Sequence, residues 1–253
     1  MTTAPVASDT WIRRFHPAPN PVPRLVCLPH AGGSASYWFP LSAALKDRVE
    51  VLSVQYPGRQ DRRAEPLIED IETLADRITV ALDPWLDDTR PLVLLGHSMG
   101  AILGFEVARR LPTGPAALIV SGRRAPDRRR VEQTHRLDDA ALTAELRSLS
   151  GTDASLLEDE EVLRMVLPAL RADYRAIETY VYTAGAALDC PITALIGDTD
   201  PKVTLDEAMS WRDHTIGTFA LHTFTGGHFY LTDHQAAVTA HITDAIRAAV
   251  DRR

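Results

Sequence analysis

The segment 92–111 restricts the fold more than any other part of the chain. It starts with the apolar run Leu92–Leu95, continues through Gly96–Gly100 (GHSMG), and ends in the helical pattern Ala101–Leu111. A short apolar run predicts a buried strand, and the two glycines allow the backbone to turn sharply from that strand into a helix. Such a turn would leave Ser98 exposed beside a helix N-terminus, which favours negative charge. The alternative is an ordinary strand-to-helix turn that contains glycine.

Strand and helix patterns alternate along most of the chain. Five further apolar runs bounded by turn signals predict strands at Arg24–Leu28, Val49–Val54, Ala116–Val120, Ile192–Ile196 and Phe219–Phe224. Apolar residues recur at helical spacing in Ser36–Leu45, Ile68–Leu82 and Gln235–Val250. This alternation predicts an α/β fold, with a mostly parallel sheet and helices on both of its faces.

The alternation stops between about residues 123 and 187. Only helical patterns occur there, around 140–149, 160–167 and 170–182. At 253 residues the chain is of a size that α/β proteins often fold as one domain. We therefore expect a single domain, 1–253, in which 123–187 forms a helical lid insertion. The lid's apolar residues would either line a channel or pack on the core; they include Leu156, Leu157, Leu163, Met165 and Leu170.

The order of residues after Ser98 fits a catalytic triad. In α/β-hydrolases with a G-x-S-x-G turn, the serine is followed along the chain by Asp or Glu and then by His. Asp200 follows the strand that ends at Ile196, and His228 lies in a glycine loop after the last strand. The pattern predicts Ser98 as nucleophile, His228 as base and Asp200 as the acid that orients it. Asp198 is the competitor, although a bond to nearby backbone amides would also explain it.

Four other histidines fit the role of base less well. His222 lies inside a strand pattern and His234 near a helix start, where a structural or solvated histidine is the commoner case. For His30 and His97 we expect hydrogen bonds that brace their loops.

An oxyanion hole requires two backbone N–H donors. The residue after the nucleophile, Met99, supplies one, and a loop after an early strand supplies the other. That second donor would be Ala31, because Gly32 and Gly33 let its loop approach closely.

Charge and composition exclude several classes of partner. A net charge of -7 argues against general nucleic-acid binding, and no segment is long and apolar enough to span a membrane. The two cysteines, Cys27 and Cys190, have no close partner, so we expect buried free thiols. We also expect the protein to be soluble, cytoplasmic and monomeric. One basic cluster stands out and is either a solvated surface or a docking site for an acidic partner: Arg123, Arg124, Arg128, Arg129 and Arg130.

The chain resembles the type II thioesterases that act beside polyketide synthases and nonribosomal peptide synthetases. The resemblance spans nearly the whole chain, and its combination of motifs is more specific than the serine motif alone. Tyr230 differs from the pattern, which has Phe at that position. The residues that carry the resemblance are Pro29–Gly33, Gln55–Arg59, Gly96–Gly100, Ser121–Pro126, Leu167–Tyr174, Gly197–Asp200 and Gly226–His228.

The resemblance supports Ser98, Asp200 and His228 as the triad. It implies hydrolysis of stalled or incorrect acyl groups from the phosphopantetheine arm of acyl or peptidyl carrier domains, without a metal or an organic cofactor. Two alternatives use the same fold. One is a general carboxylesterase or lipase acting on small oxygen esters, and the other is a catalytically silent scaffold that binds carrier domains.

Overall fold

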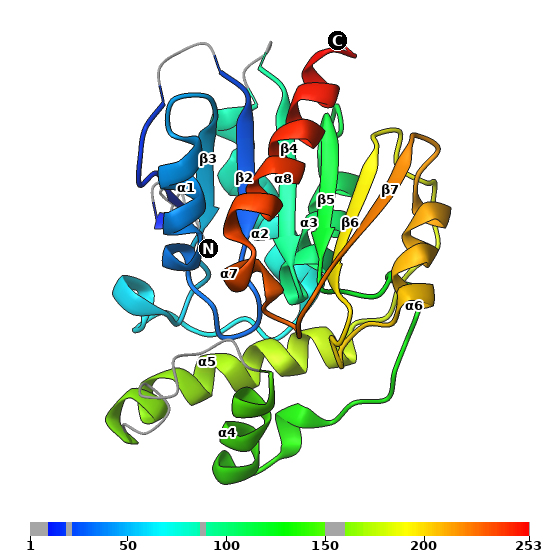
Figure 1. The fold of residues 1–253 in the computed structure, drawn as a ribbon. Coiled ribbons are helices and arrows are strands. Elements are labelled where there is room, and N and C mark those ends of the chain that lie inside the picture. Colours follow the sequence, from blue (N-terminus) through cyan, green and yellow to red (C-terminus); the bar gives the residue numbers. More distant parts are fainter. Residues whose placement is uncertain (1–9, 19–21, 87–89, 150–159, 253) are drawn as a thin grey trace.

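A seven-stranded sheet forms the centre of the protein (Figure 1). The computed structural model describes residues 10–18, 22–86, 90–149 and 160–252. The strands lie in the order β1-β3-β2-β4-β5-β6-β7, and all neighbours are parallel except β1, which runs antiparallel to β3. Their bounds are β1 Ile12–Arg13, β2 Arg24–Leu28, β3 Glu50–Val54, β4 Leu92–His97, β5 Ala117–Ser121, β6 Ile192–Gly197 and β7 Phe219–Phe224. The predicted α/β fold is confirmed, and among the described residues β1 is the one strand that the sequence patterns missed.

Alternate residues of each strand pack on opposite faces of the sheet. On one face, Val26 and Leu94 pack with helices α2 (Ile71–Leu82) and α3 (Met99–Arg110). On the other face, the adjacent residues Leu25 and Leu95 pack with α1 (Phe39–Leu45) and α8 (Gln235–Val250). Figure 1 shows α8 and α1 in front of the sheet and α2 and α3 behind it. Both faces are covered, which explains why the central strands are apolar along their whole length.

Between β5 and β6 the described residues contain helices and no named strand. They are a 3-10 turn (Thr134–Arg136), α4 (Asp139–Ser148) and α5 (Glu160–Thr179). Figure 1 shows α5 lying across the end of the sheet where the parallel strands finish. Leu156 and Leu157, which were expected in this segment, lie outside the described residues.

The prediction of separate helices at 160–167 and 170–182 is wrong, because α5 continues through Pro168. A proline inside a helix costs about 3 kcal/mol. However, Leu167 and Leu170, on either side of it, are buried against Leu142 of α4. Burial of one leucine side chain contributes roughly 1.5–3 kcal/mol, so this packing offsets the cost of the proline.

Short elements complete the connections. Asp70 caps α2 by accepting a hydrogen bond from the Thr73 amide at 2.7 Å, so this helix begins three residues later than its apolar pattern does. The remaining elements are 3-10 turns at Ala35–Trp38, Gln60–Arg62, Asp83–Trp85 and Ser210–His214, with helices α6 (Leu205–Met209) and α7 (Tyr230–Asp233). Cys27 and Cys190 are both buried free thiols. Among the described residues, none of the helices has the length and apolar character needed to cross a membrane.

Two positions on α2 test the assignment of its buried face. Ile78 is fully buried, whereas Val80, two residues later, is 58% exposed. We expect Ile78→Ala to lower the free energy of unfolding by about 2–5 kcal/mol through the cavity it leaves. Val80→Ala is the matched control and should change it by less than about 0.5 kcal/mol. Equal losses in urea denaturation would contradict the assignment.

Candidate active site

Ser98 occupies a strained turn between β4 and α3. Its backbone has φ 55° and ψ -118°, a conformation that costs a non-glycine residue of order 1–3 kcal/mol. A Cβ on Gly96 would lie 1.9 Å from the carbonyl oxygen of Gly100, and one on Gly100 would lie 2.1 Å from that of Leu28. No larger residue fits at either glycine, so the backbone can close up beneath Ser98. This geometry excludes the alternative of an ordinary strand-to-helix turn that contains glycine.

Asp200 and His228 form a buried pair at the same end of the sheet. The Nδ1 atom of His228 lies 2.8 and 3.0 Å from the two carboxylate oxygens of Asp200, and both side chains are almost completely buried. Because a carboxylate only accepts hydrogen bonds, Nδ1 donates and Nε2 remains available as a proton acceptor. The amide of Lys202 donates a further bond to Asp200, which fixes the carboxylate.

Asp198 has a different contact. It is exposed, and its Oδ1 accepts a hydrogen bond of 2.9 Å from the amide of Gly226, two residues before His228. Asp198 therefore links the two loops that carry Asp200 and His228. This agrees with the alternative explanation for Asp198, a bond to nearby backbone amides.

The other histidines lie apart from this pair or next to it. The ring of His222 packs at a tilt against that of His241, with centroids 3.9 Å apart, and His234 contacts the Thr225 carbonyl at 2.7 Å. His97 bonds to Ser121 through Nδ1 at 3.0 Å. For the His30 ring, no hydrogen bond is found within the described ranges. The expected brace is thus present for His97 and is replaced at His30 by aromatic packing on Tyr37 and Phe229.

Burial keeps His30 and His97 neutral. It lowers the pKa of His30 to about 3, with a smaller contribution from repulsion by His228. Burial, with the same repulsion, also places the pKa of His97 well below its usual range. Tyr230, whose hydroxyl distinguishes this chain from the family pattern, lies 2.6 Å from Ser121 Oγ. The additional hydroxyl therefore extends a buried network that ends at His97.

The loop that carries Ala31 is held by a buried ion pair. Asp173 of α5 accepts a 2.7 Å bond from the amide of Gly32 and pairs with Arg59. Arg59 also donates to the carbonyl of Gly33 at 3.0 Å, while Tyr56 donates to the carbonyl of Pro29 at the same distance. The sequence motifs contained these residues, but their function as anchors was not predicted. Arg59 and Asp173 are 114 residues apart, and only the fold brings them together.

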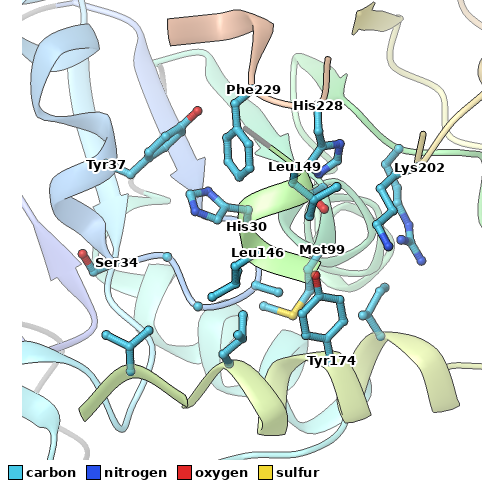
Figure 2. A pocket seen from close by; sticks show the side chains of 18 of the residues that line it. His30, Ser34, Tyr37, Met99, Leu146, Leu149, Tyr174, Lys202, His228 and Phe229 are labelled. Carbon is cyan, nitrogen blue, oxygen red and sulfur yellow. The ribbon is translucent and has the colours of Figure 1, made fainter. Parts of the chain in front are cut away.

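These elements enclose a cavity of about 400 Å³ (Figure 2). All of the predicted site residues except Asp200, which stands behind His228, line it. In Figure 2, Tyr37 and Lys202 lie on opposite sides of the cavity. Helices α4 and α5 add an apolar wall: Leu146, Val162, Leu163, Val166 and Leu170. Of the lid leucines named from the sequence, Leu163 and Leu170 line the cavity, while Met165 is exposed.

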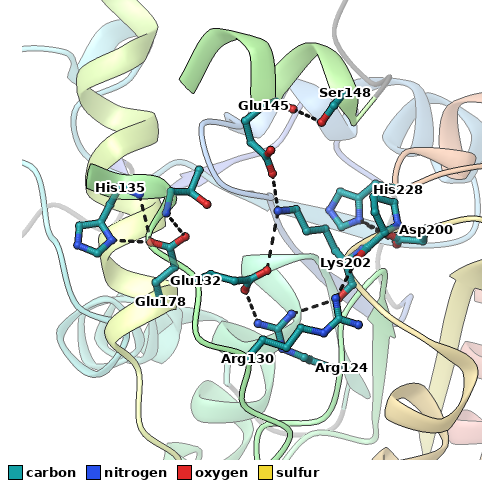
Figure 3. A network of polar contacts seen from close by, with 12 residues as sticks. Arg124, Arg130, Glu132, His135, Glu145, Ser148, Glu178, Asp200, Lys202 and His228 are labelled. Atoms are coloured by element: carbon teal, nitrogen blue, oxygen red, sulfur yellow. Dashed lines mark hydrogen bonds and ion pairs between the residues drawn. The ribbon is translucent and has the colours of Figure 1, made fainter. Parts of the chain in front are cut away.

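A polar network joins α4 to the loop that follows β6 (Figure 3). The Lys202 ammonium lies 2.5 Å from Glu145 on α4, and it also approaches Glu132 at 3.9 Å. Glu132 in turn pairs with Arg124, which donates to the Lys202 carbonyl. Because Lys202 is two residues beyond Asp200, the position of α4 is coupled to the loop of the candidate acid. Sequence analysis did not predict this network.

Neutralising Asp173 should disturb both stability and the Ala31 loop. Asp173→Asn leaves the buried Arg59 without its counter-charge, so we expect a loss of about 3–5 kcal/mol in the free energy of unfolding. Arg247→Ala is the control, since it breaks an ion pair whose side chains are both about two-thirds exposed. That variant should lose less than about 1 kcal/mol in chemical denaturation. Similar losses for the two variants would mean that the buried pair is not an anchor.

Comparison with known proteins is consistent with this architecture. The chain is 53% identical over its whole length to the thioesterase PikA5 of Streptomyces venezuelae, of which it covers 93%. It is also 53% identical to a probable cadicidin biosynthesis thioesterase of Streptomyces griseus, with 97% of the chain and 68% of that protein aligned. Both relatives are therefore similar along nearly all of this chain.

Solved structures agree with the sequence relatives. The type II thioesterase BorB from the borrelidin biosynthetic cluster superposes with a TM-score of 0.89 at 51% identity, covering 95% of this chain and 99% of BorB. The type II thioesterase YbtT of the yersiniabactin pathway gives 0.84 at 31% identity, covering 95% and 99%. Residues 23–246 match the family described as the thioesterase domain. The chain therefore belongs to the thioesterase family, and the resemblance found in its sequence is confirmed.

Proposed function

We propose that this protein is a serine thioesterase that removes aberrant or stalled acyl groups from the phosphopantetheine arm of carrier domains in polyketide or nonribosomal peptide biosynthesis. The observation that carries the proposal is the position of Ser98, in a strained turn on a largely apolar cavity that it shares with His228. The solved relative YbtT, a type II thioesterase from the yersiniabactin NRPS/PKS biosynthetic pathway, supplies the class of substrate.

His228 acts as the general base in this proposal. Its Nδ1 proton is directed at Asp200, so Nε2 accepts the hydroxyl proton of Ser98 as the serine oxygen attacks the thioester carbonyl carbon. The carbon–oxygen π electrons move onto the carbonyl oxygen and give a tetrahedral oxyanion. Asp200 stabilises the imidazolium that forms and remains ionised.

Two backbone amides stabilise the oxyanion. The amide of Met99 is the first of helix α3 and is directed away from the helix, where the helix dipole favours negative charge. The second donor is the amide of Ala31. Its loop is fixed through Gly32 to Asp173 and through Gly33 to Arg59, so this donor is held in place before substrate binds.

Collapse of the intermediate breaks the carbon–sulfur bond. A thiol has a pKa of about 8.5, so the sulfur leaves readily, and the proton on His228 Nε2 neutralises the departing thiolate. His228 then deprotonates a water molecule that attacks the acyl-serine ester. Proton return to the Ser98 oxygen releases a carboxylic acid and restores the enzyme.

The helical segment 123–187 would act as a lid of one domain formed by residues 1–253. Its helices α4 and α5 supply the apolar wall of the cavity and leave room for a short acyl chain beside Ser98. In this proposal the lid excludes water from the acyl-enzyme until a water molecule is required.

Substitution of the nucleophile tests the proposal directly. We expect Ser98→Ala to lower the rate of acetyl release from an acetyl-loaded carrier protein by about 10³-fold or more, because the remaining site can only bind and polarise the substrate. Ser36→Ala is the matched control, since Ser36 lines the same cavity and has no assigned chemical role. Free acid released over time, separated by chromatography, is the readout.

Three outcomes would contradict the proposal. Full activity of Ser98→Ala would eliminate Ser98 as nucleophile. Rapid hydrolysis of p-nitrophenyl esters by the unaltered protein, together with no release from carrier thioesters, would favour a general esterase. Absence of hydrolysis with both substrates would favour the silent scaffold.

A further inference from the structure

The order of strands determines the side of Ser98 on which the leaving group departs. Ser98 follows β4, and the Ala31 loop follows β2, which neighbours β4 on one side. Strand β5 neighbours β4 on the other side and leads into Gly122 and Arg123. A Cβ on Gly122 would lie 3.3 Å from Cε1 of His228, so this loop lies against the candidate base. Since the base gives its proton to the leaving sulfur, the leaving group faces the β5 side.

Arg123, the next residue on that side, lines the cavity with an unsatisfied donor. Its Nε atom is buried without a hydrogen-bond partner, and its guanidinium forms no ion pair within the described ranges. The nearest acids are otherwise engaged, because Glu132 pairs with Arg124 and Glu178 binds His135. A buried donor without a partner is costly, so this site favours a ligand that brings acceptor oxygens.

The guanidinium of Arg123 remains charged at neutral pH. Burial, followed by repulsion from Arg124, lowers its pKa to about 9. Hydrogen bonds from a charged donor contribute roughly 1.5–3 kcal/mol, more than those between neutral groups. An acceptor beside Arg123 would therefore gain substantially in binding free energy.

A second cavity of about 200 Å³ adjoins the first one at Arg123. The two cavities have Arg123, Ile177 and Glu178 in common, so the arginine stands between them. The walls of the second cavity include Arg128 and Arg129, both of which are exposed. A ligand in this cavity would meet one half-buried cation, Arg123, at its inner end and two exposed cations at its mouth.

The cations at the mouth are only weakly compensated. Arg128 contacts Asp127 at 3.5 Å and donates to Ser210, whereas Arg129 has no ion pair in the part of the chain that the structure describes. By contrast, Arg130 is paired with Glu207 at 2.5 Å. The whole chain carries a net charge of -7, so Arg128 and Arg129 form a local region of positive charge in an acidic protein. Such a region favours the binding of an anion.

We propose that the phosphopantetheine arm of the carrier domain enters through this second cavity. Its phosphodiester binds Arg128 and Arg129 at the mouth, and the amide carbonyl nearest the sulfur accepts hydrogen bonds from Arg123. The acyl chain lies on the opposite side of Ser98, against α4 and α5. The inference rests on the proposed function and deepens it, because it assigns an entry path and a docking surface to the carrier.

The chemistry of the arm matches the order of these side chains. From the thioester outward, the arm presents an amide, a second amide and a phosphodiester. Guanidinium groups bind phosphate oxygens through pairs of parallel hydrogen bonds, and they bind carbonyl oxygens singly. The sequence of donors from Ser98 outward, one half-buried arginine and then two exposed ones, follows the sequence of acceptors along the arm.

Charge reversal at the mouth tests the docking surface. We expect R128E/R129E to lower kcat/KM on an acetyl-loaded carrier protein by about tenfold or more, mainly through KM. The loss on acetyl N-acetylcysteamine, a thioester truncated after the first amide, should be at least about tenfold smaller. The matched control is R247E/R252E, which makes the same change of charge at two exposed positions after β7 and should leave the two substrates equally affected.

Arg123 is tested by a change in the leaving group. Arg123→Met keeps an unbranched side chain as far as the position of Nε and removes the donors. We expect kcat/KM for acetyl N-acetylcysteamine to fall by about tenfold or more, with a much smaller fall for S-ethyl thioacetate, which lacks the amide. Equal losses on both thioesters would show that the arginine has only a structural role.

The results also separate this inference from the proposed function. If the unaltered protein hydrolyses carrier thioesters and R128E/R129E behaves like R247E/R252E, the entry path is overturned while the proposed function stands. If the unaltered protein hydrolyses the truncated thioester but not the carrier thioester, the proposed function fails and the inference fails with it.

Discussion

The close approach of backbone to backbone around Ser98 is the constraint on which the rest of the site depends. Gly96 and Gly100 let the end of β4 and the start of α3 touch, and Gly100 also touches the carbonyl of Leu28 at the end of β2. The positive φ of Ser98 is maintained because the buried strands on both sides fix the turn. The packing of the whole sheet therefore holds Ser98 in its strained conformation.

Two polar links connect the helices over the cavity to this centre. Asp173 of α5 binds the Ala31 loop and Arg59, while Glu145 of α4 binds Lys202, close to Asp200. The candidate oxyanion donor and the candidate acid are therefore each tied to the helical segment between β5 and β6. Movement of that segment would change the geometry on both sides of Ser98 together. This coupling gives the lid of our proposal a physical means of influencing the reaction.

Much of this arrangement was predictable from local sequence. Apolar runs identified β2 to β7, and the order of Ser98, Asp200 and His228 was enough to nominate three residues that the fold brings to one end of the sheet. The continuity of α5 was not predictable, because a proline such as Pro168 normally marks a helix boundary and only tertiary packing overrides it. Strand β1 has two residues, too few for a periodic pattern.

Long-range polar contacts were also not predictable from the sequence. Nothing in the sequence around Arg59 or Asp173 indicates that the two are partners, and Lys202 gives no sign that it reaches Glu145. The same holds for Arg123, which looked like one member of a surface cluster and is instead in the wall of the cavity. Such residues acquire their roles from the fold, so they can be assigned only after the strands are ordered.

The central claim is that the turn presents Ser98 as the nucleophile that His228 activates. Its most direct test is to treat the protein with a fluorophosphonate probe and to locate the adduct by peptide mass spectrometry. We expect one phosphonylated residue, Ser98, in the peptide that spans β4 and α3. An adduct on a different serine, or no adduct at all on the folded protein, would contradict it.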